Sequence, residues 1–238
     1  MHGQEVMDIQ TWSRETAWDD ERRFGYLKPL IPDKSLLDFG CGTGGFLLLA
    51  RKLAAKAHGV ELEDRLKNYF NNQGLTVFHS LSEIPKDAGG YDIITLFHVL
   101  EHIPDPKSEL IALSKNLTDG GEIIVEVPNA VDVLLTLYNN EPFSNFTYWS
   151  CHLFLFTVKT LEMLASQAGL KINYIKHIQR YPLSNHLYWL SRGKPGGHKL
   201  WHFLDSLEIH TAYEKQLAAI GKCDTIIGSF SKQSNYKS

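Results

Sequence analysis

The sequence predicts an α/β fold in which a parallel sheet carries helices on both faces. Short apolar segments alternate with helical segments from residue 35 onward, which builds parallel strands through right-handed crossovers. A glycine-rich turn joins the first apolar segment to the first of these helices, and acidic residues stand near the ends of the first two apolar segments. Because ligands of such sheets bind at the carboxyl ends of the strands, these residues predict a binding site there.

The elements follow one another in a regular order. A helix is expected over residues 14–29, where Trp18, Phe24 and Leu27 recur at helical spacing. Buried strands and helices then alternate as far as Pro128, which ends the fifth strand. The strands are expected at 35–39, 56–62, 75–80, 91–97 and 122–128, and the intervening helices at 44–55, 64–72 and 106–117.

The alternation breaks at residues 129–156, an aromatic-rich insertion where a short turn would serve. After it we expect a helix at 157–168, a strand at 171–180, a long loop at 181–198, a helix from about 199 to 220 and a last strand at 223–230. The length suits a single domain over residues 1–238. Within it, 1–30 would form an N-terminal helical segment, and 129–156 and 181–200 would be insertions on the substrate side.

Composition narrows the class of protein. The net charge of −3 argues against a dedicated nucleic-acid protein, so nucleic acid is only a second choice of partner. The three cysteines, Cys41, Cys151 and Cys223, form no C-x-x-C pair, which gives no sign of a disulfide framework or a zinc knuckle. No apolar run is long enough to span a bilayer. We therefore expect a cytoplasmic protein without a membrane partner, and the sequence leaves its oligomeric state open.

The stretch "LLDFGCGTGGF", residues 36–46, fits two fingerprints at once. Its glycines match the G-x-G-x-x-G of dinucleotide-binding proteins and also the D-x-G-x-G-x-G turn of S-adenosylmethionine (SAM) enzymes. Asp38 would repel a diphosphate but suits a ligand that carries an ammonium and a sulfonium. Glu61, at the end of the second strand, can accept hydrogen bonds from ribose hydroxyls in either case.

Over roughly residues 20–175 the chain resembles class I SAM-dependent methyltransferases, in the small-molecule branch that includes ubiquinone-biosynthesis and sugar-modifying enzymes. The resemblance rests on "LLDFGCGTGGF", "GVELED", "YDIITLFHVLEHIPDP" and "LTDGGEIIVEVPN". It implies a Rossmann-like, seven-stranded mixed sheet in the order 3-2-1-4-5-7-6, with strand 7 antiparallel. It also implies SAM as the cofactor.

The same resemblance implies the residues of the cofactor site. Phe97 and His98 would line the methionine end, and Ser80 and Leu81 would flank the adenine, although many relatives have an acid near position 80. The full set of cofactor-binding residues is then Asp38, Gly40, Cys41, Gly42, Gly44, Glu61, Leu62, Ser80, Leu81 and Phe97.

Two histidines are candidates for catalysis. "HVLEH", residues 98–102, matches the H-x-x-E-H pattern of zinc peptidases, but Pro104 and Pro106 interrupt the helix that such ligands need. We therefore expect no metal site, with His98 facing the active site and Glu101 and His102 structural. His152 could serve as the base that takes a proton from an acceptor hydroxyl, or it could pack between its aromatic neighbours; both readings stay open.

The acceptor is predicted from charge. Between Glu162 and Asp205 the chain has no acid but several bases, which is unusual in a chain of negative net charge. This segment could bind an anionic acceptor such as a phosphorylated or nucleotide-linked sugar, or it could be a solvated surface. The predicted substrate-binding residues are Tyr148, Trp149, Arg180, Tyr181, Arg192 and Lys194.

The sequence thus predicts methyl transfer from SAM to a small, phosphate-bearing acceptor, most simply to an oxygen. Three alternatives remain: an NAD(P)-dependent oxidoreductase, a catalytically silent SAM-binding module and an RNA methyltransferase. Nitrogen and carbon acceptors also stay open.

Overall fold

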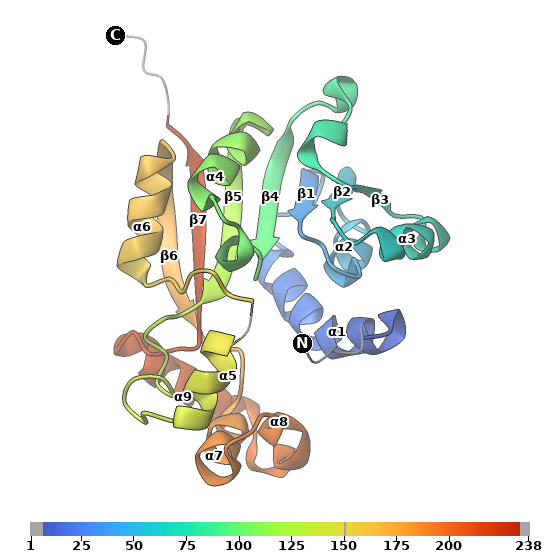
Figure 1. The fold of residues 1–238 in the computed structure, drawn as a ribbon. Coiled ribbons are helices and arrows are strands. Elements are labelled where there is room, and N and C mark those ends of the chain that lie inside the picture. Colours follow the sequence, from blue (N-terminus) through green and yellow to red (C-terminus); the bar gives the residue numbers. More distant parts are fainter. Residues whose placement is uncertain (1–6, 150, 234–238) are drawn as a thin grey trace. The chain divides into compact units, whose positions relative to one another are not determined.

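The computed structural model describes residues 7–149 and 151–233, and the side chain of Trp149 lies outside this description. Within these residues, seven strands form one sheet in the order β3-β2-β1-β4-β5-β7-β6 (Figure 1). β1 pairs in parallel with β2 and β4, whereas β6 and β7 are antiparallel. The predicted Rossmann-like mixed sheet and its strand order are therefore confirmed.

The chain forms two compact units. We call Met1–Phe97 with Ala112–Ile124 the N-terminal unit, and His98–Ile111 with Val125–Ser238 the C-terminal unit. Each is described by itself below.

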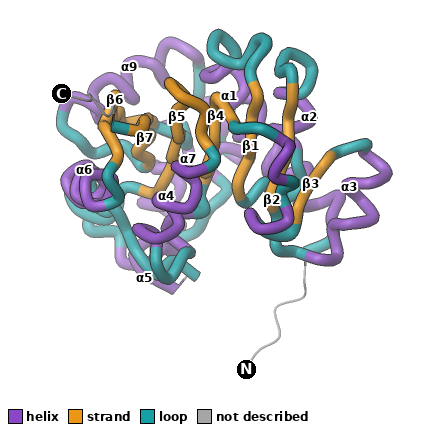
Figure 2. Tube along the Cα trace, turned by 90° about the horizontal axis from the view of Figure 1, so that it is seen from above, coloured by secondary structure: helices purple, strands orange, loops and turns teal. Residues whose placement is uncertain are grey.

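The N-terminal unit contains the first four strands and the helices between them. β1, β2 and β3 lie side by side in Figure 2, and buried residues such as Leu36, Leu37 and Ile94 make their apolar core. Asp8 begins the first helix by accepting a hydrogen bond from the Thr11 amide at 2.9 Å. The elements are α1 (Ile9–Leu27), β1 (Ser35–Phe39), α2 (Gly45–Ala50), β2 (Lys56–Val60), η1 (Asp64–Leu66), α3 (Lys67–Gln73), β3 (Thr76–Phe78), η2 (Leu81–Glu83), η3 (Lys86–Ala88) and β4 (Tyr91–Phe97).

The C-terminal unit begins directly after β4. α4 (Pro106–Lys115) and β5 (Leu117–Pro128) each belong partly to this unit. Its core includes Val133, Leu134, Trp189, Leu217 and Cys223. The remaining elements are η4 (Leu100–His102), α5 (Glu141–Trp149), α6 (Val158–Gln167), β6 (Leu170–Ile178), α7 (Leu183–Arg192), α8 (Gly197–Leu200), η5 (His202–Leu204), α9 (Leu207–Ala219) and β7 (Thr225–Lys232).

The largest difference from the sequence-based expectation is at residues 181–198. The expected loop contains α7, which ends at Gly193 with a φ of 62°, a left-handed conformation that glycine adopts readily. The helix expected at 199–220 is divided into α8, η5 and α9, because Ser206 starts a new helix by accepting from the Ile209 amide. The insertion at 129–156 likewise contains a helix, α5.

Candidate functional site

The glycine-rich turn after β1 has a backbone that needs glycine. Gly40, Gly42 and Gly44 have φ values of 74°, 52° and 74°, which L side chains rarely adopt. A Cβ on Gly44 would also meet the Leu75 side chain at 2.6 Å. The Gly40 amide donates to the Val60 carbonyl at 2.8 Å, and this bond ties the turn to the end of β2. The turn therefore brings the backbone close to whatever binds at the start of α2, as the glycines of cofactor-binding turns do.

Two acids stand beside this turn. Asp38 is buried at the end of β1 and accepts a hydrogen bond from Thr95 Oγ1 at 2.7 Å. Burial raises the pKa of Asp38 to about 7. Glu61 accepts from the amides of Gly42, at 2.8 Å, and Glu63, at 3.0 Å. Because a carboxylate has about four acceptor positions, Glu61 retains capacity for the hydroxyls of a ribose.

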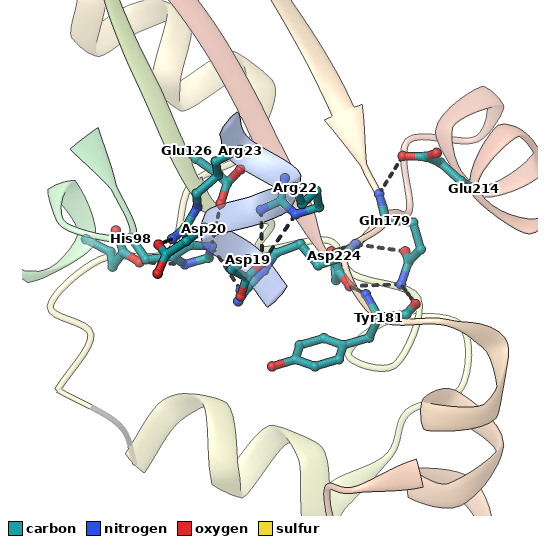
Figure 3. Close-up of polar contacts among 12 residues, drawn as sticks. Asp19, Asp20, Arg22, Arg23, His98, Glu126, Gln179, Tyr181, Glu214 and Asp224 are labelled. Carbon is teal, nitrogen blue, oxygen red and sulfur yellow. Dashed lines mark hydrogen bonds and ion pairs between the residues drawn. The ribbon is translucent and has the colours of Figure 1, made fainter. Parts of the chain in front are cut away.

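Helix α1 contributes residues that the sequence analysis missed. Asp20 and Arg23 are buried on this helix, and their side chains are 3.8 Å apart (Figure 3). The Arg23 guanidinium lies 4.8 Å from the centre of the Phe97 ring, and a Cβ on Gly45 would collide with the Asp20 carboxylate. Burial raises the pKa of Asp20 to about 6. The i, i+3 acid–base pair in "DDERR" was the available signal, but such pairs are common on solvated helices.

These groups fit SAM. The cofactor carries an ammonium, for which a buried carboxylate such as Asp38 is suited, and a ribose, for which Glu61 is suited. The hydroxyl of Thr43, inside the glycine turn, is buried and has no hydrogen-bond partner among the described residues. This orphaned group adds one further donor or acceptor at the turn.

The other predicted cofactor residues lie in the same unit. Cys41 is partly buried, and burial raises the pKa of its thiol well above the ordinary value, so it is not a nucleophile. Leu62 is exposed. The Ser80 hydroxyl lies 2.8 Å from that of Ser82, and Leu81 begins η2. Phe97 packs edge-on against Phe46, with ring centres 5.1 Å apart.

The C-terminal unit contains a cavity of about 290 Å³, which we call the acceptor cavity. Its apolar wall includes Phe143, Phe146 and Trp189, and the ring centre of Trp189 lies 5.1 Å from that of Phe143 and 5.5 Å from that of Phe146. Its polar lining includes His98, Asn129, Asp132, His152, Arg180, Tyr181, Asn185, His186, His198 and Asp224.

Four of the predicted residues therefore line one cavity, although they are far apart in the chain: His98, His152, Arg180 and Tyr181. Arg192, Lys194 and Tyr148 are exposed and are not among the residues that line it. Asp132, His186 and Asp224 were missed, because isolated polar residues in apolar segments carry no sequence signal for a shared cavity.

His98 is held in an uncommon conformation. Its φ is 56°, which is rare for a residue other than glycine and is found most often at functional sites. Its Nδ1 lies 3.2 Å from Glu101 Oε1, and its Nε2 lies 3.3 Å from Glu126 Oε1 and 2.9 Å from Arg180 Nη1. Burial alone would raise the pKa of Glu101, but the hydrogen bond and charge of His98 outweigh it and lower that pKa.

Asp224 fixes the backbone that carries Arg180 and Tyr181. Its carboxylate accepts from the amides of these two residues at 2.9 Å and 3.0 Å, and from Gln179 Nε2 at 2.8 Å (Figure 3). The backbone amide of Gln179 donates to Glu214 Oε1 at 3.0 Å. The hydrogen bonds from Arg180 and Tyr181 lower the pKa of Asp224, but burial has the larger effect and raises it. These hydrogen bonds hold the backbone from which the Arg180 side chain extends.

His152 is half-buried, and its ring centre lies 5.0 Å from that of His102. Burial lowers the pKa of His152, so its ring is neutral at neutral pH. Glu101, His102 and His152 each offer a ligand atom within 4.8 Å of the others, and Glu101 Oε2 is buried without a hydrogen-bond partner among the described residues.

This trio could hold a cation, so the expected absence of a metal site stays a prediction. The segment that carries the H-x-x-E-H pattern has only the three-residue η4. It therefore lacks the sustained helix that zinc-peptidase ligands need, as predicted. His102, expected to be structural, bonds the Cys151 carbonyl at 3.0 Å through Nδ1.

Comparisons with known proteins identify the family of the chain. A family model described as a methyltransferase domain matches residues 13–175. A ubiquinone biosynthesis O-methyltransferase of Coxiella burnetii is 29% identical over 166 residues, which cover 65% of this chain and 71% of that protein. A protein of the same name from Hydrogenovibrio crunogenus is 26% identical over 203 residues, covering 72% of this chain and 84% of that protein.

Solved structures show the same fold. A SAM-dependent methyltransferase of Archaeoglobus fulgidus has a TM-score of 0.59 at 16% identity and covers 93% of this chain and 99% of its own. The magnesium protoporphyrin IX methyltransferase of Synechocystis, solved with bound S-adenosylhomocysteine (SAH), has a TM-score of 0.57 at 11% identity, with 97% and 90% covered.

The fold, together with the glycine turn and its two acids, is typical of enzymes that bind a nucleoside-containing cofactor. The family match tells which of these enzymes the chain resembles. The chain belongs to the methyltransferase domain family. It is a methyltransferase whose cofactor is SAM, which decides between the two fingerprints of the glycine turn. Within the described residues, no helix has the length and apolar character needed to cross a membrane.

Proposed function

We propose that the protein transfers the methyl group of SAM to an oxygen of a small acceptor bound in the acceptor cavity. The observation that carries the proposal is the convergence of His98, His152 and Arg180 on one cavity with an aromatic wall. The relatives from Coxiella burnetii and Hydrogenovibrio crunogenus are named as O-methyltransferases, which supports oxygen over nitrogen or carbon.

The cavity favours a compact acceptor with one ring. Its volume of about 290 Å³ lies at the lower end of the range for small-molecule sites. Phe143, Phe146 and Trp189 offer faces and edges on which a sugar or an aromatic ring can pack. Arg180 offers a planar cation to a phosphate or carboxylate. We therefore propose an anionic acceptor, in the first place a phosphorylated sugar or the sugar ring of a nucleotide-linked sugar, with Arg180 as its charge partner.

Each residue then has a stated role. When bound, SAM supplies an electrophilic methyl group on a sulfonium. Asp38 and Glu61 hold the ammonium and ribose of the donor, so their task is positioning, which supplies most of the acceleration in such reactions. His152, which is neutral because of its burial, takes the proton from the acceptor hydroxyl as the oxygen attacks. His98 follows Phe97 in the chain and presents its ring to the same cavity.

We also keep the cytoplasm as the proposed location. Cys41, Cys151 and Cys223 are all free thiols, as is usual in a reducing compartment.

A turnover screen with labelled SAM tests the proposal. The acceptors are phosphorylated sugars, nucleotide-linked sugars and hydroxylated aromatic acids, each with its neutral counterpart and with an amine analogue. We expect label on an oxygen of an anionic acceptor. Label on the amine alone would overturn the oxygen assignment, and equal turnover of neutral and charged acceptors would overturn the role of Arg180. SAH binding without turnover of any acceptor would favour the silent module.

A further inference from the structure

Helix α7 buries several polar residues and leaves two of its three leucines exposed. Ser184, Asn185 and His186 are almost fully buried, together with Tyr188 and Trp189. The side chains of Leu187 and Leu190, by contrast, are 37% and 45% exposed. Residues three apart lie on the same side of a helix, so the two leucines form an apolar face that this unit does not cover.

The next elements continue this pattern. In α8, in η5 and at the start of α9, the exposed fractions are 61% for Leu200, 72% for Phe203 and 77% for Leu207. α7 contacts α8, η5 and α9, and α7 and α8 are neighbours in Figure 1. We call Leu187, Leu190, Leu200, Phe203 and Leu207 the apolar ridge.

The ridge is built on a fixed base. Trp201, between Leu200 and Phe203, packs edge-on against Tyr188 with ring centres 4.9 Å apart. A Cβ on Gly197 would collide with α7, so α8 approaches that helix closely. Ser184 donates from its amide and hydroxyl to Asp205 at 3.2 Å and 2.6 Å. Trp201 and Asp205, two positions before and after Phe203, are thus held against α7, while Phe203 itself is exposed.

The charge around the ridge is positive. Arg192, Lys194 and Lys199 are exposed on the same stretch of chain, which has no acid between residues 163 and 204. Asp205 is turned toward Ser184. Two exposed acids oppose the three cations: Glu208 on the first turn of α9, and Glu141, whose neighbour Pro142 lies beside Gly193. The local balance is therefore positive in a chain whose net charge is −3.

We propose that the apolar ridge docks the protein on an anionic lipid surface. Exposed Leu and Phe side chains enter the boundary between headgroups and acyl chains, while flanking Lys and Arg remain with the anionic headgroups. This peripheral contact is independent of the proposed acceptor, and it replaces the sequence-based expectation of no membrane partner. That expectation rested on the lack of a long apolar run, whereas the ridge collects its apolar residues from four separate elements: α7, α8, η5 and α9.

The charges favour lipid over a second copy of the chain. In a symmetric dimer the same patch faces itself, which would bring Arg192, Lys194 and Lys199 of both copies together. An anionic headgroup layer instead neutralises each cation.

The test is co-sedimentation of the full-length protein with vesicles of phosphatidylcholine alone and of phosphatidylcholine mixed with phosphatidylglycerol. We expect binding to the mixed vesicles and little to the neutral ones. Binding should weaken with salt, because the screening length falls from about 10 Å at 0.1 M to about 3 Å at 1 M. Lys194→Ala and Lys199→Ala should each weaken the partition by about fivefold.

Leu200→Ser/Phe203→Ser should weaken binding by about tenfold or more. The matched control is Met163→Ser/Leu137→Ser, which removes two exposed apolar side chains outside the ridge and should leave binding unchanged. Equal melting temperatures would show that all variants fold. No binding to mixed vesicles at low salt, or the same loss in the control, overturns the proposal. So does a wild-type dimer that Phe203→Ser dissociates in the absence of lipid.

Discussion

Nη1 of Arg180 lies 2.9 Å from Nε2 of His98. Because a guanidinium can only donate, Nε2 accepts this bond and carries no proton. Nδ1 then carries the ring proton and faces Glu101 Oε1 at 3.2 Å. Glu126 Oε1 lies 3.3 Å from the same Nε2. Any anion that draws Arg180 away therefore changes the hydrogen bonding of His98.

This relationship makes Arg180 the first residue to test. Arg180→Ala should raise the KM for an anionic acceptor by about 10- to 100-fold, because a hydrogen bond to a charged group contributes ~1.5–3 kcal/mol. The KM for the matching neutral acceptor should change much less. Steady-state kinetics with both acceptors measures the difference.

Arg192→Ala is the control, because Arg192 is exposed and does not line the acceptor cavity. It should keep the wild-type KM. If Arg180→Ala also keeps it, the acceptor is not held through an anionic group.

His152 should control turnover but not cofactor binding. His152→Ala should lower kcat by ~10²-fold, the usual contribution of a general base. The SAH affinity measured by calorimetry should stay the same. Because burial lowers the pKa of His152, kcat of the wild type should hold to a pH below the ordinary 6.5 before it falls. A variant with wild-type kcat would show that His152 only packs against His102.

Treatment with a chelator distinguishes two roles of His152, that of a free general base and that of a metal ligand. If His152 acts as a free base, EDTA treatment followed by gel filtration should leave kcat within about twofold of its original value. If Glu101, His102 and His152 hold a catalytic cation instead, activity should be lost and should return with added metal. Elemental analysis of the purified protein gives an independent reading.

The parts of the fold that the sequence predicted are those set by local pattern. β1 and its glycine turn follow from short-range rules, because apolar residues 36 and 37 and the glycines beside them are adjacent in the chain. α7 was missed because its buried side mixes polar Ser184, Asn185 and His186 with two aromatic residues, and two of its leucines are exposed. The polar residues find partners within the unit, so the usual apolar periodicity that marks a helix is absent.

At the site, too, only residues that belong to a local motif could be predicted from the sequence. Asp38 and Glu61 could be found from one motif and its spacing, whereas the acceptor cavity draws on segments near residues 98, 132, 152, 180 and 224. Nothing local links Asp224 to Arg180, 44 positions away, since only the β6–β7 pairing brings them together. Asp20 and Arg23 were missed for a similar reason, because their burial depends on Phe97 and on Gly45.

Asp38 should make the protein less stable as pH rises. Burial raises its folded pKa to about 7 from 3.8, so between these values the folded state keeps a proton that the unfolded state has lost. The free energy of unfolding then falls with increasing pH across this window. Asp38→Asn should remove that slope and stabilise the apo protein at pH 8 by up to ~4 kcal/mol, at 1.36 kcal/mol for each pKa unit.

Denaturant unfolding from about pH 4 to 8 measures this effect. Asp92→Asn is the control of opposite sign, because hydrogen bonds from Ser35 and Thr118 outweigh burial and lower the pKa of Asp92. Above pH 3.8 the free energy of unfolding of Asp92→Asn should therefore be lower than that of the wild type. A wild-type pH slope in Asp38→Asn would show that Asp38 is ionised in the folded protein.

Cofactor binding should release a proton from Asp38. At a pH below about 7 this carboxyl is protonated in the apo protein, but it must be ionised to pair with the ammonium of the cofactor, so SAH affinity should fall about tenfold for each pH unit below 7. Calorimetry in buffers of different ionisation enthalpy counts the released proton directly. Glu61→Gln should weaken SAH binding at every pH while keeping the same slope, since its part is to accept from the ribose. Asp38→Asn should weaken binding and abolish the slope, and a wild-type affinity that is flat from about pH 5.5 to 7.5 would place the ammonium away from Asp38.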